Sequence, residues 1–243
     1  MCDGEIMITV EHLSIQFSSI RAIEDVSLTL QGGILYGMVG PNGAGKSSLI
    51  KALVGIISEY SGTISYDNLP LKQNKYRIKQ KLGYAPEDIV LLPFLTGEEY
   101  LQMIADLRSL KDRSKEISDL INNLGMDDKK DTIIDQYSHG MKQKLSLAAA
   151  LIGSPENIIL DEALNGLDPR SLFNIKEKLR QISHLGGIIL LSSHSLDLVE
   201  DLCQQILVMN ASKLVKLISQ KELQDAKEKE GKKFSDYYLD LIK

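Results

Sequence analysis

The stretch GPNGAGKSS at residues 40–48 restricts the fold of this chain more than any other feature. It matches the pattern G-x-x-x-x-G-K-[S/T] in full, after the mostly apolar segment ILYGMVG and before KSSLIKALVGII, which has helical spacing. Its glycines let successive N–H groups turn inward around phosphate oxygens. Lys46 is placed to reach phosphates, and the Ser47 hydroxyl to ligate Mg²⁺. We therefore predict a strand–loop–helix unit that binds phosphate, rather than a glycine-rich turn that merely caps a helix.

The rest of the chain alternates apolar strands with helical segments, which is typical of an α/β protein with a parallel sheet covered on both faces. Between about residues 94 and 155 the pattern becomes helical, and its first helix begins with a capping box formed by Thr96 and Glu99. We expect an α/β core interrupted by a helical insertion, with a charged and then amphipathic tail. The apolar strands after the insertion are residues 157–160, 187–193 and 205–210.

Polar side chains follow two of these apolar strands. NIILDE ends with Asp161, which is expected to hold Mg²⁺ through water, and Glu162, which is expected to accept a proton from attacking water. LLSSHS carries His194 to the same edge of the sheet, where ligands collect in such folds, and its imidazole could bond to a γ-phosphate. Taken alone, Glu162 could be a solvated loop charge and His194 a structural residue. Their occurrence together favours the functional interpretation.

A second anion site is indicated by DQYSHGMKQKLSLAAAL at residues 135–151. Ser138 is a candidate N-cap, and the residues after it are strong helix formers. A helix that starts this way presents free backbone N–H groups and the positive end of its dipole, which suits an anion. The helix start alone does not say whose phosphate it would hold.

Composition restricts the class of partner. With 28 Lys and Arg against 33 Asp and Glu, the net charge of −5 argues against broad nucleic-acid binding. Cys2 and Cys203 lie far apart, and this spacing argues against a disulfide framework or a zinc site. No apolar run approaches the roughly 20 residues that cross a bilayer, and the acidic start MCDGE is not that of a signal peptide. A cytoplasmic protein is expected.

The order of the motifs resembles that of the ATP-binding cassette ATPases. The matching segments are the Walker A loop Gly40–Ser47, the signature stretch YSHGM at 137–141, the Walker B segment IILDE, the D-loop NGLD at 165–168, and His194. Pro169 falls at the first position of the helix that follows the D-loop, as in this family. The resemblance spans about residues 6–215.

This resemblance implies a P-loop NTPase core whose parallel sheet is flanked by helices, an N-terminal antiparallel β subdomain, and an inserted helical subdomain. Residues 1–225 would form one ATPase domain, with the core in 1–88 and 156–225 and the helical subdomain in 89–155. Residues 226–243 would form a C-terminal helical tail.

The resemblance also implies ATP and Mg²⁺ as cofactors. Lys46, Glu162 and His194 would be catalytic, and Ser47, Asp161 and Glu87 would hold the metal. Phe17 falls at the adenine-stacking position, although a core residue on an alternating strand is nearly as compatible with its pattern. The nucleotide-binding residues implied are Phe17, Gly40, Pro41, Asn42, Gly43, Ala44, Gly45, Lys46, Ser47, Ser48, Glu87, Ser138, His139, Gly140 and Asp168.

In this family two cassettes pair head to tail, so Ser138 and Gly140 would hold the γ-phosphate bound by a second, like or unlike, cassette. The chain resembles the ATPases of bacterial exporters for drugs or antimicrobial peptides. It would hydrolyse ATP to drive export through a separately encoded integral membrane subunit, at the inner face of the cell membrane and without nucleic acid. ATP would close the pair of cassettes, and hydrolysis would reopen it.

The chain departs from the family pattern at three places. His139 replaces the usual second glycine of the signature, Glu87 stands where many members have Gln, and MNASKLV lacks the glycine expected in a hairpin turn. Two other classes of protein share parts of this pattern. One is a soluble cassette ATPase acting on translation or DNA, and the other is a P-loop GTPase or small-molecule kinase. A GTPase would need N-K-x-D, whereas Asn74–Lys75 is followed by Tyr-Arg.

Overall fold

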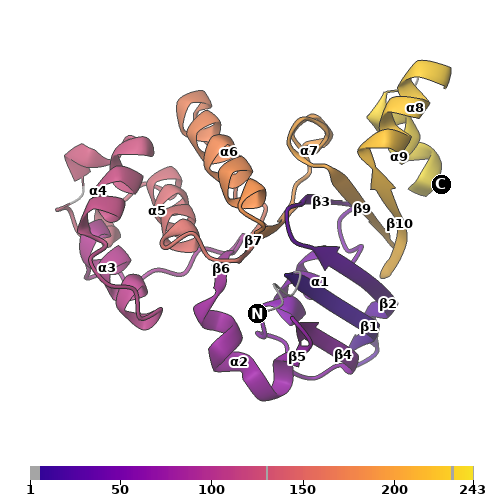
Figure 1. Cartoon of the computed structure of the whole chain (residues 1–243), viewed down its shortest axis with the longest axis horizontal. Coiled ribbons are helices and arrows are strands. Elements are labelled where there is room, and N and C mark those ends of the chain that lie inside the picture. Colours follow the sequence, from indigo (N-terminus) through magenta and orange to yellow (C-terminus); the bar gives the residue numbers. More distant parts are fainter. Residues whose placement is uncertain (1–5, 130, 231–232, 243) are drawn as a thin grey trace.

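The computed structural model describes residues 6–129, 131–230 and 233–242 of the chain. Cys2 and the acidic start lie outside the described residues, as do three positions of the predicted tail, 231, 232 and 243. Two sheets and a separate group of helices make up the molecule (Figure 1).

The first sheet is antiparallel and has the strand order β2-β1-β4-β5. Its two long strands bury alternate side chains, as expected where one face of a sheet packs on a core. This sheet confirms the antiparallel N-terminal subdomain. Its strands are β1 (Met7–Phe17), β2 (Ile20–Gln31), β4 (Ser61–Tyr66) and β5 (Leu69–Pro70).

The second sheet has the strand order β10-β9-β3-β8-β7-β6, and all its pairs are parallel except β10 with β9. Every residue of β3, β7 and β8 is buried, as their continuous apolar sequences predict. Its strands are β3 (Leu35–Val39), β6 (Leu82–Ala85), β7 (Asn157–Asp161), β8 (Ile188–Ser192), β9 (Gln205–Asn210) and β10 (Lys213–Ser219).

Helices cover this sheet, and α3, α4 and α5 form a group to one side of it (Figure 1). Three predicted helix starts are confirmed: Thr96 and Glu99 form a capping box, Ser138 caps α5, and Pro169 is the first residue of α6. The α-helices are α1 (Lys46–Leu53), α2 (Leu71–Gln80), α3 (Gly97–Leu107), α4 (Ser114–Asn123), α5 (His139–Leu151), α6 (Pro169–His184), α7 (Leu196–Leu202), α8 (Gln220–Glu230) and α9 (Phe234–Ile242).

Two local features differ from what the residues suggested. The α2 helix was not expected, because it is strongly polar, buries only Leu71 and Ile78, and has a non-helical backbone at Asn74. The MNASKLV hairpin forms without glycine, because Ala211 and Ser212 adopt left-handed φ angles of 45° and 67° in the turn between β9 and β10. Two left-handed residues give the twist that a two-residue hairpin needs.

The tail packs on the core. Phe234 at the start of α9 is buried in the same apolar cluster as the residues of α7 and β9, and α8 runs across the expected boundary between residues 225 and 226. The helical group shares that cluster too, since α3, α4 and α5 contribute buried residues to it. The core of the helical group is therefore continuous with that of the sheet.

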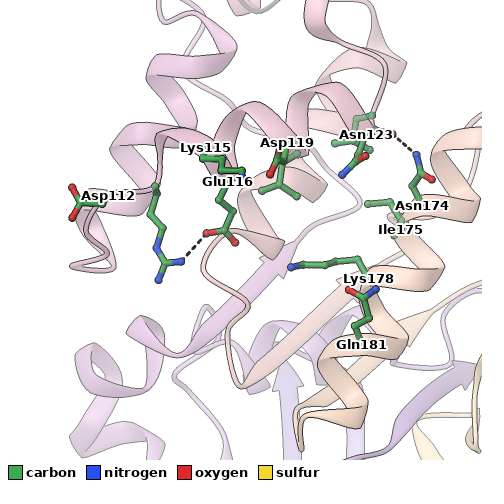
Figure 2. A pocket seen from close by; sticks show the side chains of 12 residues that line it. Asp112, Lys115, Glu116, Asp119, Asn123, Asn174, Ile175, Lys178 and Gln181 are labelled. Carbon is green, nitrogen blue, oxygen red and sulfur yellow. Dashed lines mark hydrogen bonds and ion pairs between the residues drawn. The ribbon is translucent and has the colours of Figure 1, made fainter.

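A polar cavity of about 540 Å³ lies between α4 and α6 (Figure 2). The two helices are joined beside it by Asn174, whose side chain donates to the carbonyl of Asn123 at 2.8 Å. Arg113 pairs with Glu116 at 3.0 Å on the helical side. The helical group and α6 are therefore in contact beside this cavity, which is lined by charged side chains and partly open to solvent.

Gly37 is required by close packing between β3 and α7. A Cβ at this position would lie 2.3 Å from a methyl of Val199 and 3.1 Å from the Cys203 sulfur. We expect Gly37→Ala to destabilise the fold by about 1–3 kcal/mol, because α7 must move away from the sheet. Denaturant unfolding measures this free energy, and an unchanged value would contradict the packing described. The control is Gly140→Ala, whose Cβ meets no atom within 4 Å and should raise helix stability slightly.

Candidate functional site

A cleft of about 540 Å³ opens at the carboxyl edge of the parallel sheet. The β1–β2 turn forms one wall, the β3–α1 loop forms the floor, and residues that follow β6, β7 and β8 form the other wall. The cleft thus collects segments that are far apart in the sequence. Its lining residues are Phe17, Ile20, Arg21, Ala22, Asn42, Gly43, Ala44, Gly45, Lys46, Ser47, Ser48, Glu87, Glu162 and His194.

Two glycines hold the β3–α1 loop close to neighbouring backbone. A Cβ on Gly40 would lie 2.3 Å from the carbonyl oxygen of Met209. Gly45, the N-cap of α1, has a φ of +100°, and a Cβ there would lie 2.5 Å from the Ala22 carbonyl oxygen. The first turn of α1 carries no acidic residue of its own, and Lys46, Ser47 and Ser48 of this turn line the cleft, so its backbone N–H groups are available to an anion. This loop fits phosphate.

Lys46 provides a buried cation in the floor of the cleft. It is 7% exposed, and its Nζ donates to the carbonyls of Gly40 at 2.7 Å and Pro41 at 3.3 Å. Burial lowers the pKa of the ammonium, and the carboxylates of Glu162, Asp161 and Glu87 oppose that shift. A phosphate could accept the hydrogen bonds that the two carbonyls now accept.

Asp161 and Ser47 bring two oxygen ligands together. The Asp161 carboxylate is 1% exposed and accepts from the Ser192 hydroxyl at 2.7 Å, while the Ser47 hydroxyl lies 3.5 Å from the same oxygen. Among the described residues no cluster of three His, Cys, Asp or Glu side chains could hold a metal. Mg²⁺ usually takes only one or two carboxylates and completes its shell with phosphate and water. The pair therefore fits Mg²⁺ bound together with a phosphate ligand.

Glu162 is held in an uncommon backbone conformation, with φ at +53°. Its Oε2 accepts from the Asn165 amide at 2.5 Å and from the His194 backbone N–H at 3.2 Å. Its Oε1 lies 3.2 Å from Nε2 of His194, but without hydrogen-bond geometry, and it has no hydrogen-bond partner among the described residues. A buried carboxylate oxygen without a partner is an acceptor available to a water molecule. Glu162 therefore has the geometry of a general base.

Phe17 is exposed at 48% and lines the cleft beside Ile20, which is exposed at 69%. The alternative interpretation of Phe17 as a core residue is therefore wrong. Ile15 is buried, and a register shift between Ile15 and Gln16 turns the following residues away from the core. Ile20, Arg21 and Ala22 also line the cleft and could not be predicted from the sequence, since the turn between β1 and β2 brings them there. The apolar pair Phe17 and Ile20 suits a flat ring.

The predicted residues Ser138, His139, Gly140 and Asp168 do not line this cleft. Ser138 accepts from the Met141 N–H at 3.3 Å at the exposed start of α5. Asp168 caps α6 and pairs with Lys144 at 2.6 Å, a bond that holds the pKa of that carboxyl well below its usual range. Within one chain, these residues are not brought to the phosphate loop.

Comparisons with known proteins agree with this geometry. A protein-family model described as ABC transporter matches residues 23–165, more than half of the chain. Across 98% of the chain the fold matches all of a solved structure described as an ATP-binding subunit of an ABC transporter, with a TM-score of 0.91 and 26% identity. These matches confirm the predicted fold class and favour this family over P-loop GTPases and kinases.

Curated relatives include two bacterial transport proteins. The chain is 32% identical to the bacitracin transport ATP-binding protein BcrA of Enterococcus faecalis, over 96% of this chain and 74% of that protein. It is 30% identical to the lantibiotic transport ATP-binding protein SrtF of Streptococcus pyogenes, over 86% of this chain and 89% of that protein. It is also 31% identical to the ABC transporter ATP-binding protein YhaQ of Bacillus subtilis, over 93% of this chain and 75% of that protein.

Lys46→Ala should lower ATP affinity at least tenfold, because it removes charge-assisted bonds that contribute about 1.5–3 kcal/mol. Isothermal titration measures the change, with circular dichroism to verify folding. Lys51→Ala is the matched control, since Lys51 lies in the last turn of the same helix and does not line the cleft. An affinity equal to that of the unmodified protein would refute the role of Lys46.

Proposed function

This chain belongs to the family of ABC transporter ATP-binding proteins, and we propose that it drives export through a separate membrane subunit by binding and hydrolysing MgATP in paired cassettes. The family match supports ATP binding and hydrolysis. The observation that carries the site assignment is Oε1 of Glu162, which has no hydrogen-bond partner among the described residues and is buried beside His194 at the mouth of the phosphate loop.

Each side chain then has a distinct task. Lys46 and the N–H groups of the β3–α1 loop bind the phosphates, and Phe17 packs against the adenine. Glu162 accepts the proton of the attacking water through Oε1, while the Asn165 and His194 N–H groups hold Oε2. Mg²⁺, held by Ser47, Asp161 and in part Glu87, would supply charge neutralisation at the phosphates. His194 would donate from Nε2 to the γ-phosphate as negative charge develops there.

The start of α5 supports pairing with a second cassette. Ser138 and His139 are exposed, the first turn of α5 contains no acidic residue, and the space beside the Cα of Gly140 is open. The fold of the chain itself therefore does not require glycine at position 140, whereas close approach of a phosphate would. In a head-to-tail pair, Ser138, His139 and Gly140 would hold the nucleotide of the partner, with Asp168 on the same face.

A groove between α2 and α3 supports docking of the membrane subunit. It has a volume of about 470 Å³ and an apolar lining that includes Ile56 and Leu107, both well exposed. Tyr84 also lines it and lies on β6, which leads directly to Glu87 in the cleft. No described helix is long and apolar enough to cross a membrane. In the proposed transporter a separately encoded integral membrane subunit would span the bilayer, with this chain at its inner face. The transport names of BcrA and SrtF support a peptide-like cargo.

Glu162→Gln should keep the shape of the site but remove the base. ATP hydrolysis should fall about 10²–10⁴-fold, and ATP should shift the variant toward a dimer in size-exclusion chromatography. The matched control is Glu200→Gln, the same change at an exposed position on α7. Hydrolysis at the unmodified rate would eliminate Glu162 as the base.

Mixing two inactive variants tests the trans arrangement. Ser138→Arg leaves the phosphate loop of its own chain intact, and Lys46→Ala leaves its signature intact. Heterodimers should contain one doubly damaged site and one intact site, so partial ATPase activity should return on mixing. If the signature stretch instead acted on the nucleotide bound by its own chain, every site in the mixture would carry one of the two defects. No activity would then return on mixing. The measurement is phosphate release against the mixing ratio, with each variant alone as the baseline.

A further inference from the structure

Asn165 connects the Glu162 carboxylate by hydrogen bonds to Ser193, the residue that follows β8. Its Nδ2 donates to Glu162 Oε2 at 2.5 Å, and its Oδ1 accepts from the Ser193 hydroxyl at 3.2 Å. The backbone N–H of Asn165 donates to the carbonyl of Glu162 at 3.2 Å. Among the described residues, the Asn165 amide is the one side-chain hydrogen-bond donor to this carboxylate. The direction in which Oε1 points therefore depends on where Asn165 lies.

Gln143 of α5 holds the backbone at Asn165 by hydrogen bonds. Its Nε2 donates to two backbone carbonyls of the loop that follows Glu162, those of Ala163 at 3.1 Å and Asn165 at 2.5 Å. Gln143 is half-buried, and a helix rise of about 1.5 Å per residue places it just over one turn from Ser138. An α-helix is stiff over one turn, so a shift of the Ser138 end moves the Gln143 amide with it.

We propose that Gln143 and Asn165 form a relay by which α5 orients the catalytic carboxylate of its own chain. The proposal rests on the proposed function, since it needs Glu162 as the base and the start of α5 as a phosphate site. When the start of α5 engages a phosphate, Gln143 carries the shift to the carbonyls of Ala163 and Asn165. Asn165 then moves Glu162 Oε2, and Oε1 swings toward or away from the water position. Gln143 and Asn165 are positioning residues and need not touch the nucleotide.

Glu162 is suited to such control. Its backbone is left-handed, and in the described part of the chain the hydrogen bonds of its carboxylate are all made by Oε2, which is therefore the point at which the carboxylate is held. Misplacing a reacting group by about 1 Å can cost on the order of 100-fold in rate. Small movements of Asn165 therefore suffice to switch the base. Phosphate binding by Lys46 and the β3–α1 loop does not involve these bonds, so the relay should affect turnover and leave ATP affinity unchanged.

Asn165→Ala should lower kcat on the order of 10- to 100-fold while the Kd for ATP changes less than about twofold. Asn122→Ala, at an exposed position of α4, should leave both values unchanged. In the Glu162→Gln background, Asn165→Ala should cause no further loss, because its effect acts through the carboxylate. A second, full loss in that background would overturn the relay and assign Asn165 a general structural role.

Gln143→Glu tests the link to α5, since it keeps the shape but replaces the donor with an acceptor that faces two carbonyls. We expect kcat to fall on the order of tenfold and the Hill coefficient of ATP hydrolysis to fall toward 1, in a variant that circular dichroism shows to be folded. Gln181→Glu, the same change at an exposed position of α6, is the control. An unchanged kcat and Hill coefficient in Gln143→Glu, with active unmodified protein, would overturn the relay. Unmodified protein that neither binds nor hydrolyses ATP would instead overturn the proposed function.

Discussion

The parallel pairing of β3, β7 and β8 is the constraint on which the site depends. Parallel strands end at the same edge of a sheet, so the residues that follow them meet there although they are distant in the chain. The register sets Met38 and Asp161 both opposite Ser192, whose hydroxyl donates to the Asp161 carboxylate. Lys46 comes after β3, Asp161 is the last residue of β7, and His194 comes after β8. Correct strand pairing therefore builds the cleft before any ligand arrives.

The charges of the cleft depend on one another. Burying Lys46 disfavours its ammonium, and the opposite charges of Glu162, Asp161 and Glu87 counter that effect. A phosphate ligand adds negative charge close to the lysine and to the carboxylates at once. The carboxylates would repel it unless a divalent cation lay between them, and Ser47 and Asp161, whose side-chain oxygens lie 3.5 Å apart, would be placed to hold such a cation. Nucleotide and metal would thus be bound together.

The sequence predicted those parts of the site that follow directly from a strand or a helix start. Asp161, Glu162 and His194 each come after an apolar strand, so their meeting at one edge could be inferred. Phe17 was left open, because the register shift in β1 depends on pairing with β2. The assignments of Ser138 and Asp168 remain predictions, as they concern a second cassette.

Gln143 and Asn165 could not be inferred from spacing, because their contact depends on how closely α5 approaches the loop after β7. That contact gives the head-to-tail pair a physical consequence. The start of α5 would hold the nucleotide of the partner, and the same helix is fastened through two amides to the base of its own chain. Each cassette would then sense the nucleotide of the other at its own Glu162. Because this coupling acts on the orientation of the base, it would change kcat and not ATP affinity, and the reciprocity that binding free energies obey does not require it to be equal in the two directions.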